Sequence, residues 1–373
     1  SDSTLAIHGG RPVRAHVLPY GRHALTDADV AAVVEVLRSE WITTGPKIAE
    51  FEEAFAAGRN ARYAVSFSSG TAALHAAVFA ANLTSGDEAI TTPLTFCATA
   101  NVVLYQGATP VFADVRPDTL TLDPDDAARR VTARTKALLP VDYAGHPAEL
   151  DHLMQLAARH GLVVIEDAAH ALGATLNGRA VGSVSHMTMF SFHPVKHLTT
   201  GEGGMVTTDD PALARRLRLF RGHGIEGDAR ARHAEGTWFY EMTALGYNYR
   251  LTDIACALGL SQLPRLGDNL ARRRTIAARY RELMARTPGL VLPTTREGAD
   301  PARNIFVPEF LERLKNYKAI RFMDWMATNG NWRRTGGSAQ RRWDERKRRP
   351  HPHRRVGVTA AAAEFVCRSV RTE

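Results

Sequence analysis

A lysine that follows an aromatic segment is the residue of this sequence best suited to covalent chemistry. Lys196 follows the run 190–195, Phe-Ser-Phe-His-Pro-Val, and the run 198–204, Leu-Thr-Thr-Gly-Glu-Gly-Gly, comes soon after it. Glycines let the backbone approach another group closely. A desolvated lysine has a lowered pKa and can form a Schiff base with an aldehyde. A lysine after a strand is otherwise an ordinary solvated residue, so this interpretation depends on its neighbours.

A second segment places carboxylates at the end of an apolar run. Residues 163–170 read Val-Val-Ile-Glu-Asp-Ala-Ala-His. The carboxylate of Asp167 could accept a hydrogen bond from a protonated ring nitrogen. The alternatives are that Asp167 caps a following helix and that His170 is an ordinary packed or surface histidine.

Two loops between a strand and a helix complete the set. In Ser68-Ser69-Gly70-Thr71 the N–H groups of a helix N-terminus could bind phosphate, although such a turn needs a glycine and a serine cap in any case. In the run 92–101, Phe96 could stack on a ligand ring, or could simply pack in the core.

Taken together, these segments match one cofactor. A phosphate cradle, a stacking ring, an acid for a pyridinium and a lysine for an aldehyde are the requirements of pyridoxal 5'-phosphate. Because all the alternatives would have to hold at once, the combination favours a site for this cofactor. No metal site is predicted, since Cys97, Cys256 and Cys367 lie far apart and form no Cys-x-x-Cys pair.

The elements that must position these residues alternate between strand and helix. Strands are expected at 63–67, 88–92, 109–114, 135–143, 162–166, 187–192 and 204–208, and helices at 28–38, 72–81, 99–104, 149–160, 253–263 and 269–287. The order predicts an α/β protein with a largely parallel sheet covered by helices on both faces. Ligands of such sheets bind beyond the carboxyl ends of the strands.

Composition limits the class of protein. The chain has 373 residues, of which 45% are hydrophobic and 23% charged, which argues against a disordered, collagen-like or disulfide-scaffold protein. No apolar run approaches the roughly 20 residues that span a bilayer. The first residues lack the basic and apolar regions of a signal peptide. We therefore expect a cytoplasmic protein without a membrane partner.

The excess positive charge lies in one segment. Residues 301–373 hold 17 Lys and Arg against 7 Asp and Glu, whereas the chain as a whole has a net charge of +8. A basic nucleic-acid-binding or regulatory protein is therefore an alternative. Against it, the segment lacks interleaved aromatic residues and a recognisable recognition helix, so no nucleic-acid partner is expected. A nicotinamide-binding fold is disfavoured, because no Gly-x-Gly-x-x-Gly follows the first strands.

The sequence resembles a known enzyme family over residues 5–290. The residues that carry the resemblance are Ser69–Leu74, Glu166–His170, Ser191–Lys196, Thr200–Gly204 and Gly246–Asp253. As a set they are similar to the DegT/DnrJ/EryC1/StrS sugar aminotransferases, which are pyridoxal-phosphate enzymes of fold type I. The resemblance implies a large domain over residues 1–265 with an N-terminal arm. A smaller C-terminal domain is implied over 266–373, although this sequence departs from the family pattern and is Arg-rich after about 303.

The resemblance also implies roles for individual residues. Lys196 would form the Schiff base and act as the catalytic base, and Asp167 would keep the pyridine nitrogen protonated. Phe96 would stack on the ring, and His170 would contact the ring or its phenolic oxygen. The residues implied to bind the cofactor phosphate are Ser69, Gly70, Thr71, Ser191 and, from the neighbouring subunit, Asn248. Those implied to bind substrate are Tyr20, Thr43, Thr44, Gly45, His193 and Arg250.

Several short segments resemble, more specifically, the family members of pseudaminic-acid biosynthesis. These segments are 19–22, 41–46, 91–101, 144–147 and 192–204. They imply that a homodimer with shared active sites moves an amino group from L-glutamate to C4 of a UDP-linked 4-keto-6-deoxy-N-acetylhexosamine. A dTDP-linked 3- or 4-keto-6-deoxyhexose is an alternative substrate. A dehydratase of the same fold is disfavoured, because its relatives carry a histidine at the position of Lys196.

Overall fold

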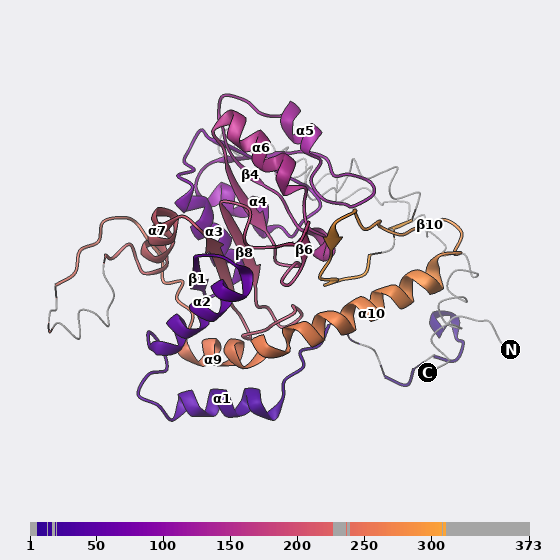
Figure 1. The fold of residues 1–373 in the computed structure, drawn as a ribbon, viewed down its shortest axis with the longest axis horizontal. Helices are drawn as coiled ribbons and strands as arrows, with labels where there is room; N and C mark the ends of the chain where they lie inside the picture. Colours follow the sequence, from indigo (N-terminus) through magenta and orange to yellow (C-terminus); the bar gives the residue numbers. More distant parts are fainter. Residues whose placement is uncertain are drawn as a thin grey trace. The chain divides into compact units, whose positions relative to one another are not determined.

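The larger of two compact units contains all the predicted site residues. The computed structural model describes residues 6–12, 14–16, 19, 21–226, 236, 239–307 and 309–310 (Figure 1). The larger unit consists of Tyr20–Ala277 and Pro293–Val307, and the smaller one of Ser1–Pro19, Ala278–Leu292 and Pro308–Glu373. The predicted boundary at residue 265 stays a prediction.

The larger unit is built on a seven-stranded sheet. Its strand order is β1-β9-β8-β5-β4-β2-β3, and β9 runs antiparallel to both of its neighbours, β1 and β8. The other pairs are parallel. The strands are β1 (Tyr63–Phe67), β2 (Glu88–Thr91), β3 (Thr109–Phe112), β4 (Thr135–Leu139), β5 (Val163–Asp167), β8 (Met187–Ser191) and β9 (Gly204–Thr208). The predicted α/β class with a largely parallel sheet is confirmed.

Helices cover both faces of this sheet. One core joins the sheet to α3 (Gly70–Ala80), α4 (Ala98–Tyr105) and α7 (Pro211–Arg221). On the opposite face, one core joins the sheet to α2 (Pro46–Arg59), α9 (Asp253–Gln262) and the start of α10 (Leu266–Met284). Another joins it to α5 (Pro124–Arg129) and α6 (Leu150–His160). The result is the three-layer arrangement that the alternation of elements predicts.

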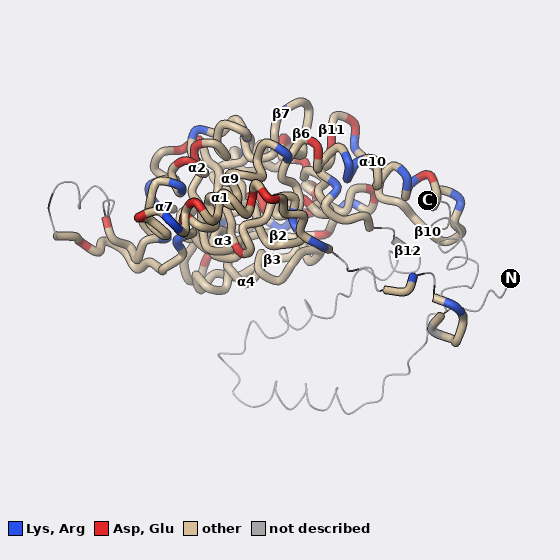
Figure 2. The backbone as a smooth tube through the Cα atoms, turned by 90° about the horizontal axis from the view of Figure 1, so that it is seen from below, with Lys and Arg blue, Asp and Glu red and all other residues tan. Residues whose placement is uncertain are grey.

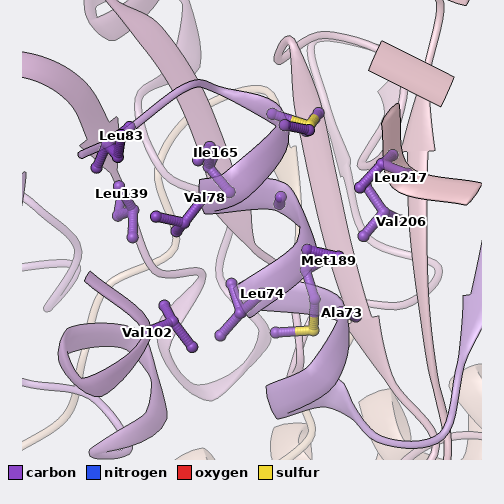
Figure 3. Packing of buried hydrophobic residues seen from close by; sticks show 14 of the residues in the cluster. Ala73, Leu74, Val78, Leu83, Val102, Leu139, Ile165, Met189, Val206 and Leu217 are labelled. Atoms are coloured by element: carbon purple, nitrogen blue, oxygen red, sulfur yellow. The ribbon is translucent and has the colours of Figure 1, made fainter. Parts of the chain in front are cut away.

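Strand residues alternate between the two faces, as the pleat requires. On β5, Ile165 packs in the core with α3, whereas Val164 packs in the core with α6. Figure 3 shows the first of these cores, where Leu74 and Val78 of α3 lie among side chains from the sheet and α4. This alternation decides which residues at the end of β5 face the site and which lie behind it.

Smaller elements complete the described chain. In the larger unit β6 (Thr175–Leu176) pairs with β7 (Arg179–Ala180) and with β11 (Ala299–Asp300), all antiparallel. Helix α1 (Asp27–Leu37) packs beside α9 and carries the buried Asp29. Short 3-10 turns cover Tyr143–Gly145 and Leu263–Arg265. The smaller unit contains the 3-10 turn Ala6–His8 and the pair β10 (Leu290–Val291) and β12 (Glu309–Phe310).

The outer edge of β1 is closed by side chains. Strand β1 ends the sheet, so its backbone groups on the far side have no neighbouring strand. The N–H of Ser66 donates to Glu52 Oε1 of α2 at 2.8 Å. The carbonyl of Ser66 accepts from Arg221 of α7 at 2.8 Å, and Arg221 also pairs with Glu52. An ion pair thus takes the place that a further strand would occupy at Ser66.

The structure corrects several predicted elements. The strand expected at 135–143 ends at Leu139, because Pro140 has no N–H for the ladder; Val141 then makes an isolated bridge to Asp167. Helices α2, α5 and α7 were not predicted. Asp123 and Asp210 cap α5 and α7 respectively, and each is followed by a proline at the first helical position, a recognisable start signal.

Charged residues of both signs are interspersed along the described part of the larger unit (Figure 2). Of the segment that is Arg-rich after about residue 303, the structure describes the residues up to 307 and the strand residues Glu309 and Phe310. The rest of the segment lies outside the described residues. Within the ranges that the structure describes, no helix combines the length and the apolar character needed to cross a membrane.

Candidate active site

Lys196 lies on the hairpin loop between β8 and β9, and contacts at both ends of the loop hold it in place. The Phe192 N–H donates to the Gly203 carbonyl at 2.9 Å, and the Thr200 N–H donates to the Phe192 carbonyl at 3.0 Å. Gln262 of α9 donates from Nε2 to the Thr199 carbonyl at 2.7 Å. Lys196 itself is half-buried. Burial lowers the pKa of its amine, and the negative charge of Asp167 opposes part of that change.

Asp167 ends β5 and is 5% exposed. Its Oδ2 accepts from Thr99 Oγ1 at 2.7 Å, and its Oδ1 accepts from the Ala169 N–H at 3.2 Å. Burial raises the pKa of Asp167, while these two hydrogen bonds and the positive charge of Lys196 act in the opposite direction. The alternative role of Asp167 as a helix cap is wrong, because a turn and not a helix follows it.

Thr99 connects Asp167 to the loop that carries Phe96. The Thr99 N–H donates to the Phe96 carbonyl at 3.2 Å, and its hydroxyl also contacts Thr95 Oγ1 at 2.7 Å. Phe96 is 74% exposed, so the alternative that it is a core residue is wrong. The loop before α4 thus presents an uncovered aromatic ring close to Thr99, the residue that holds Asp167. Sequence reasoning missed Thr99, because its partner lies 68 positions away.

The residues predicted to bind phosphate lie where α3 begins. Ser69 caps the helix, and its Oγ accepts from the Ala72 N–H at 3.1 Å, so the alternative role of Ser69 as a cap is confirmed. This leaves the N–H groups of Gly70 and Thr71, which no preceding turn of the helix uses. A methyl group on Gly70 would lie 3.1 Å from Ser191 Cβ, so the end of β8 closes against the start of α3. This arrangement suits an anion.

His170 lies in the turn after Asp167 and next to a tyrosine. Its ring centroid is 6.4 Å from that of Tyr143. Burial lowers the pKa of His170 to about 3, with a smaller contribution from the charge of Lys196, so the imidazole is neutral near pH 7. Gly145 has φ of +91°, and a side chain there would meet the His170 carbonyl oxygen at 2.7 Å. The segment 143–147 therefore packs closely against His170.

The predicted substrate residues lie in more than one place. Asp253 accepts from the N–H groups of Gly45 and Lys47 at 2.7 and 2.9 Å, and Thr43 bridges to Thr252. These contacts join segments that are about 200 positions apart in the sequence. His193 is exposed on the Lys196 loop. Tyr20 lies outside the described residues; Gly21, which follows it, packs against Val195.

Thr44, Gly45 and Arg250 line a cavity of about 840 Å³ near the outer edge of β1. Lys196 and Asp167 are not among its lining residues. Asn248 is exposed, and its backbone bridges to Gly222. The adjacent Tyr249 carbonyl accepts from the Ser68 N–H at 2.8 Å, so the 246–250 segment lies directly beside the turn that precedes α3 in its own chain.

The residues present fit pyridoxal 5'-phosphate. An anion cradle, an exposed ring, a buried carboxylate and a half-buried amine lie at the carboxyl ends of β1, β2, β5 and β8. Gly204 brings the next strand close, since a side chain there would lie 2.5 Å from the Ser69 carbonyl oxygen. When bound, this cofactor supplies an aldehyde for amine exchange and a ring that accepts electrons. The fold and the site together define a pyridoxal-phosphate enzyme of fold type I.

Comparisons with known proteins identify the family. Residues 23–330 match the DegT/DnrJ/EryC1/StrS aminotransferase family. The spore coat polysaccharide biosynthesis protein SpsC of Bacillus subtilis (strain 168) is 43% identical over 301 residues, which are 80% of this chain and 77% of SpsC. Because the match covers most of the chain, the protein belongs to the DegT/DnrJ/EryC1/StrS aminotransferase family. It is a sugar aminotransferase that depends on pyridoxal 5'-phosphate.

Solved structures agree with this assignment. Spr1654 of Streptococcus pneumoniae, whose structure is known in PLP and PMP forms, superposes in the PMP form with a TM-score of 0.74 and 32% identity, over 79% of each chain. Helicobacter pylori PseC, an aminotransferase involved in the biosynthesis of pseudoaminic acid, superposes with a TM-score of 0.73 and 31% identity. That match covers 83% of this chain and 82% of PseC.

Proposed function

We propose that this aminotransferase moves an amino group from L-glutamate to C4 of a UDP-linked 4-keto-6-deoxy-N-acetylhexosamine. The observation that supports amine chemistry is the electrostatic interaction of the half-buried Lys196, on the loop after β8, with the buried Asp167 at the end of the neighbouring β5. The similarity to PseC along most of the chain supports the sugar. The segments 41–46 and 144–147 resemble the same group of enzymes.

Lys196 is proposed to carry the proton in both halves of the reaction. Burial lowers the pKa of its amine, which favours the free base that a proton transfer needs. With the cofactor bound, Nζ of Lys196 would take the α-proton of glutamate in the first half-reaction. In the second it would give a proton to C4 of the keto sugar, so the amine ends each full cycle in the state in which it began. Protonation from a single face sets the configuration of the new amine.

The other side chains bind and orient. Asp167 would keep the pyridine nitrogen of the bound cofactor protonated, and Thr99 fixes the direction of the Asp167 carboxylate. Phe96 would stack on the cofactor ring. Because His170 is neutral near pH 7, it can contact the ring without adding positive charge beside Lys196. These roles make the buried carboxylate the main electrostatic support of the reaction.

A substrate panel tests the proposed sugar. The purified enzyme is incubated with glutamate and with either UDP-linked 4-keto-6-deoxy-N-acetylhexosamine or dTDP-linked 3- or 4-keto-6-deoxyhexoses, and amino sugar and 2-oxoglutarate are quantified. We expect kcat/KM to be at least about 100-fold higher for the UDP compound, because a site built for the acetamido group rejects a sugar that leaves its polar groups unpaired. Turnover of only the dTDP compounds would contradict the proposed sugar and leave the aminotransferase assignment standing.

We propose further that the enzyme is a homodimer with shared active sites. Several large apolar side chains of the larger unit are exposed: Phe96, Leu104, Tyr105, Met242, Leu245 and Tyr247. Tyr105 and Tyr247 both pack against His75, at ring-centroid distances of 5.2 and 5.1 Å, so the end of α4 and the segment 242–247 lie side by side. Exposed apolar side chains that lie together, as those of these two segments do, are typical of a protein interface. A second copy of the chain is the proposed partner.

Mixing two inactive variants tests whether Asn248 acts on the neighbouring site. Lys196→Ala and Asn248→Ala are purified separately, mixed, dissociated and reassembled. If Asn248 serves the partner's site, each mixed dimer regains one intact site, and we expect recovery of about a quarter of wild-type activity. If Asn248 serves its own chain, no site is restored and activity stays at the level of the separate variants. Light scattering that finds an active monomer would contradict the dimer itself.

A further inference from the structure

Two buried carboxyl groups lie behind Asp167, on the opposite side of the sheet's end. Asp142 and Glu166 are both 0% exposed. Asp142 Oδ2 and Glu166 Oε1, one oxygen from each group, are buried side-chain atoms. In the described part of the chain, no N–H or O–H group donates a hydrogen bond to either of these oxygens. Neither residue has a role in the mechanism above. Unpaired buried polar atoms are rare in folded proteins, so this pair requires an explanation.

The remaining oxygens of the two groups are fully used. Asp142 Oδ1 accepts from the Ala148 N–H at 2.8 Å. Glu166 Oε2 accepts from Thr188 Oγ1 at 2.7 Å and from Ser185 Oγ at 3.1 Å. The two carboxyl groups are also hydrogen-bond neighbours of each other. The unpaired oxygens therefore belong to groups that are already held in place from their other sides.

One proton satisfies both oxygens. Ionised carboxylates only accept hydrogen bonds, so two of them side by side in a dry interior repel each other. A single added proton turns one group into a donor and removes the repulsion. Burial, followed by the negative charge of Glu166, raises the pKa of Asp142 well above its usual range. Burial raises the pKa of Glu166 as well, but the hydroxyls of Thr188 and Ser185 donate to it and oppose that change. Within the described residues no hydroxyl donates to Asp142 in this way, so the geometry favours the proton on Asp142.

We propose that Asp142 is a protonated acid that donates a hydrogen bond to Glu166, and that through this bond it is a positioning residue for Asp167. The backbone supplies the link. The Asp142 N–H donates to the Asp167 carbonyl at 3.0 Å, and the Asp167 N–H donates to the Pro140 carbonyl at 2.9 Å. Glu166 precedes Asp167 on β5. The two backbone hydrogen bonds and the shared proton thus join the chain after β4 to Glu166 and Asp167, the last two residues of β5.

The net charge of Asp142 and Glu166 lies next to Asp167 and therefore acts on the site. With the proton in place, Asp142 and Glu166 together carry one negative charge, next to the charge of Asp167. The positive charge that faces Asp167 is that of Lys196, while Ala169 and Thr99 donate neutral hydrogen bonds to it. The positioning role rests on the proposed function of Asp167, whereas the protonation of Asp142 does not. The two parts are therefore tested separately.

Infrared spectroscopy of the cofactor-free protein at pH 7 tests the protonation. A protonated carboxyl gives a C=O stretching band that ionised carboxylates lack. We expect wild-type protein to show such a band, and Asp142→Asn and Glu166→Gln each to remove it, because the new amide donates to the remaining carboxylate. Asp29→Asn is the matched control: hydrogen bonds from Arg265, Ser261 and Thr26 outweigh burial and lower the pKa of Asp29 to about 2. Absence of the band from wild-type protein, or its persistence in both variants, would overturn the protonation.

Cofactor binding tests the positioning role. We expect Asp142→Ala to weaken pyridoxal-phosphate binding by about 10-fold or more and to alter the absorption spectrum of the bound cofactor, because it leaves the Ala148 N–H and a Glu166 oxygen unpaired. We expect Asp142→Asn to restore most of this loss, since its amide can make both bonds. If folded Asp142→Ala protein binds the cofactor with wild-type affinity and spectrum, or if Asp142→Asn binds as weakly as Asp142→Ala, the positioning role is wrong.

Discussion

Replacing Lys196 with alanine is expected to abolish transamination while the protein still folds and binds its cofactor. The proposed cofactor contacts at the start of α3 and at the carboxylate of Asp167 remain in this variant, so we expect non-covalent binding to survive. The proton transfers lose their base, and we expect kcat to fall by about 10³-fold or more in both half-reactions. Single-turnover absorbance measurements with glutamate alone and with the keto sugar alone follow the two halves separately.

Lys196→Arg separates charge from proton transfer in the same experiment. Arginine keeps a positive charge opposite Asp167 but does not release its proton near pH 7, so we expect this variant to be as inactive as the alanine variant. Lys136, which is exposed on β4, provides the matched control, and Lys136→Ala is expected to retain wild-type activity. Substantial glutamate-dependent turnover by Lys196→Ala would refute the role of Lys196.

Asp167→Asn is expected to lower kcat by about 10²- to 10³-fold with little loss of stability, because a neutral amide cannot hold the pyridine nitrogen charged. The fold tolerates the change for a specific reason. The asparagine oxygen can accept from the Ala169 N–H, and its amide can donate to Thr99 Oγ1, which turns to accept. Steady-state kinetics and thermal unfolding are measured on the same preparation.

A second buried aspartate provides the comparison. Asp126 of α5 accepts from the Asp114 N–H and pairs with Arg129 and Arg130. Asp126→Asn removes a buried carboxylate without touching the site, so we expect a lowered free energy of unfolding with unchanged kcat. If instead Asp167→Asn were as active as wild type, Asp167 would serve only the turn that follows β5.

The strands were easier to predict than the helices for a physical reason. Strands β1 and β9 were predicted with the bounds that the structure shows, since short apolar β-branched runs between turn residues leave few alternatives. Helix α2 was missed because its buried face is not purely apolar. Glu52 lies there between Phe51 and Phe55, and its partners Ser66 and Arg221 lie 14 and 169 positions away on other elements. Such a pattern becomes clear only after the chain has folded.

The same distinction applies to the site. Lys196 and Asp167 could be proposed from sequence because their local segments combine apolar strands, small residues and a reactive group. Thr99 and Asp142 could not, since each acts through a partner on another strand or helix and nothing near it in sequence indicates the contact. Residues that act directly are marked by their own neighbours, whereas residues that hold them are marked only by the fold.

The ion pair at the edge of β1 also bears on how this protein behaves in concentrated solution. An open sheet edge is a template on which another chain can add a strand and begin to aggregate. Here Glu52 and Arg221 occupy the outward backbone groups of Ser66, but Glu52 belongs to α2, which must stay docked for the edge to remain closed. Partial detachment of that one helix would free the outward Ser66 N–H while the rest of the sheet stays folded. The solubility of the enzyme therefore depends on the local stability of α2 more than on its global stability.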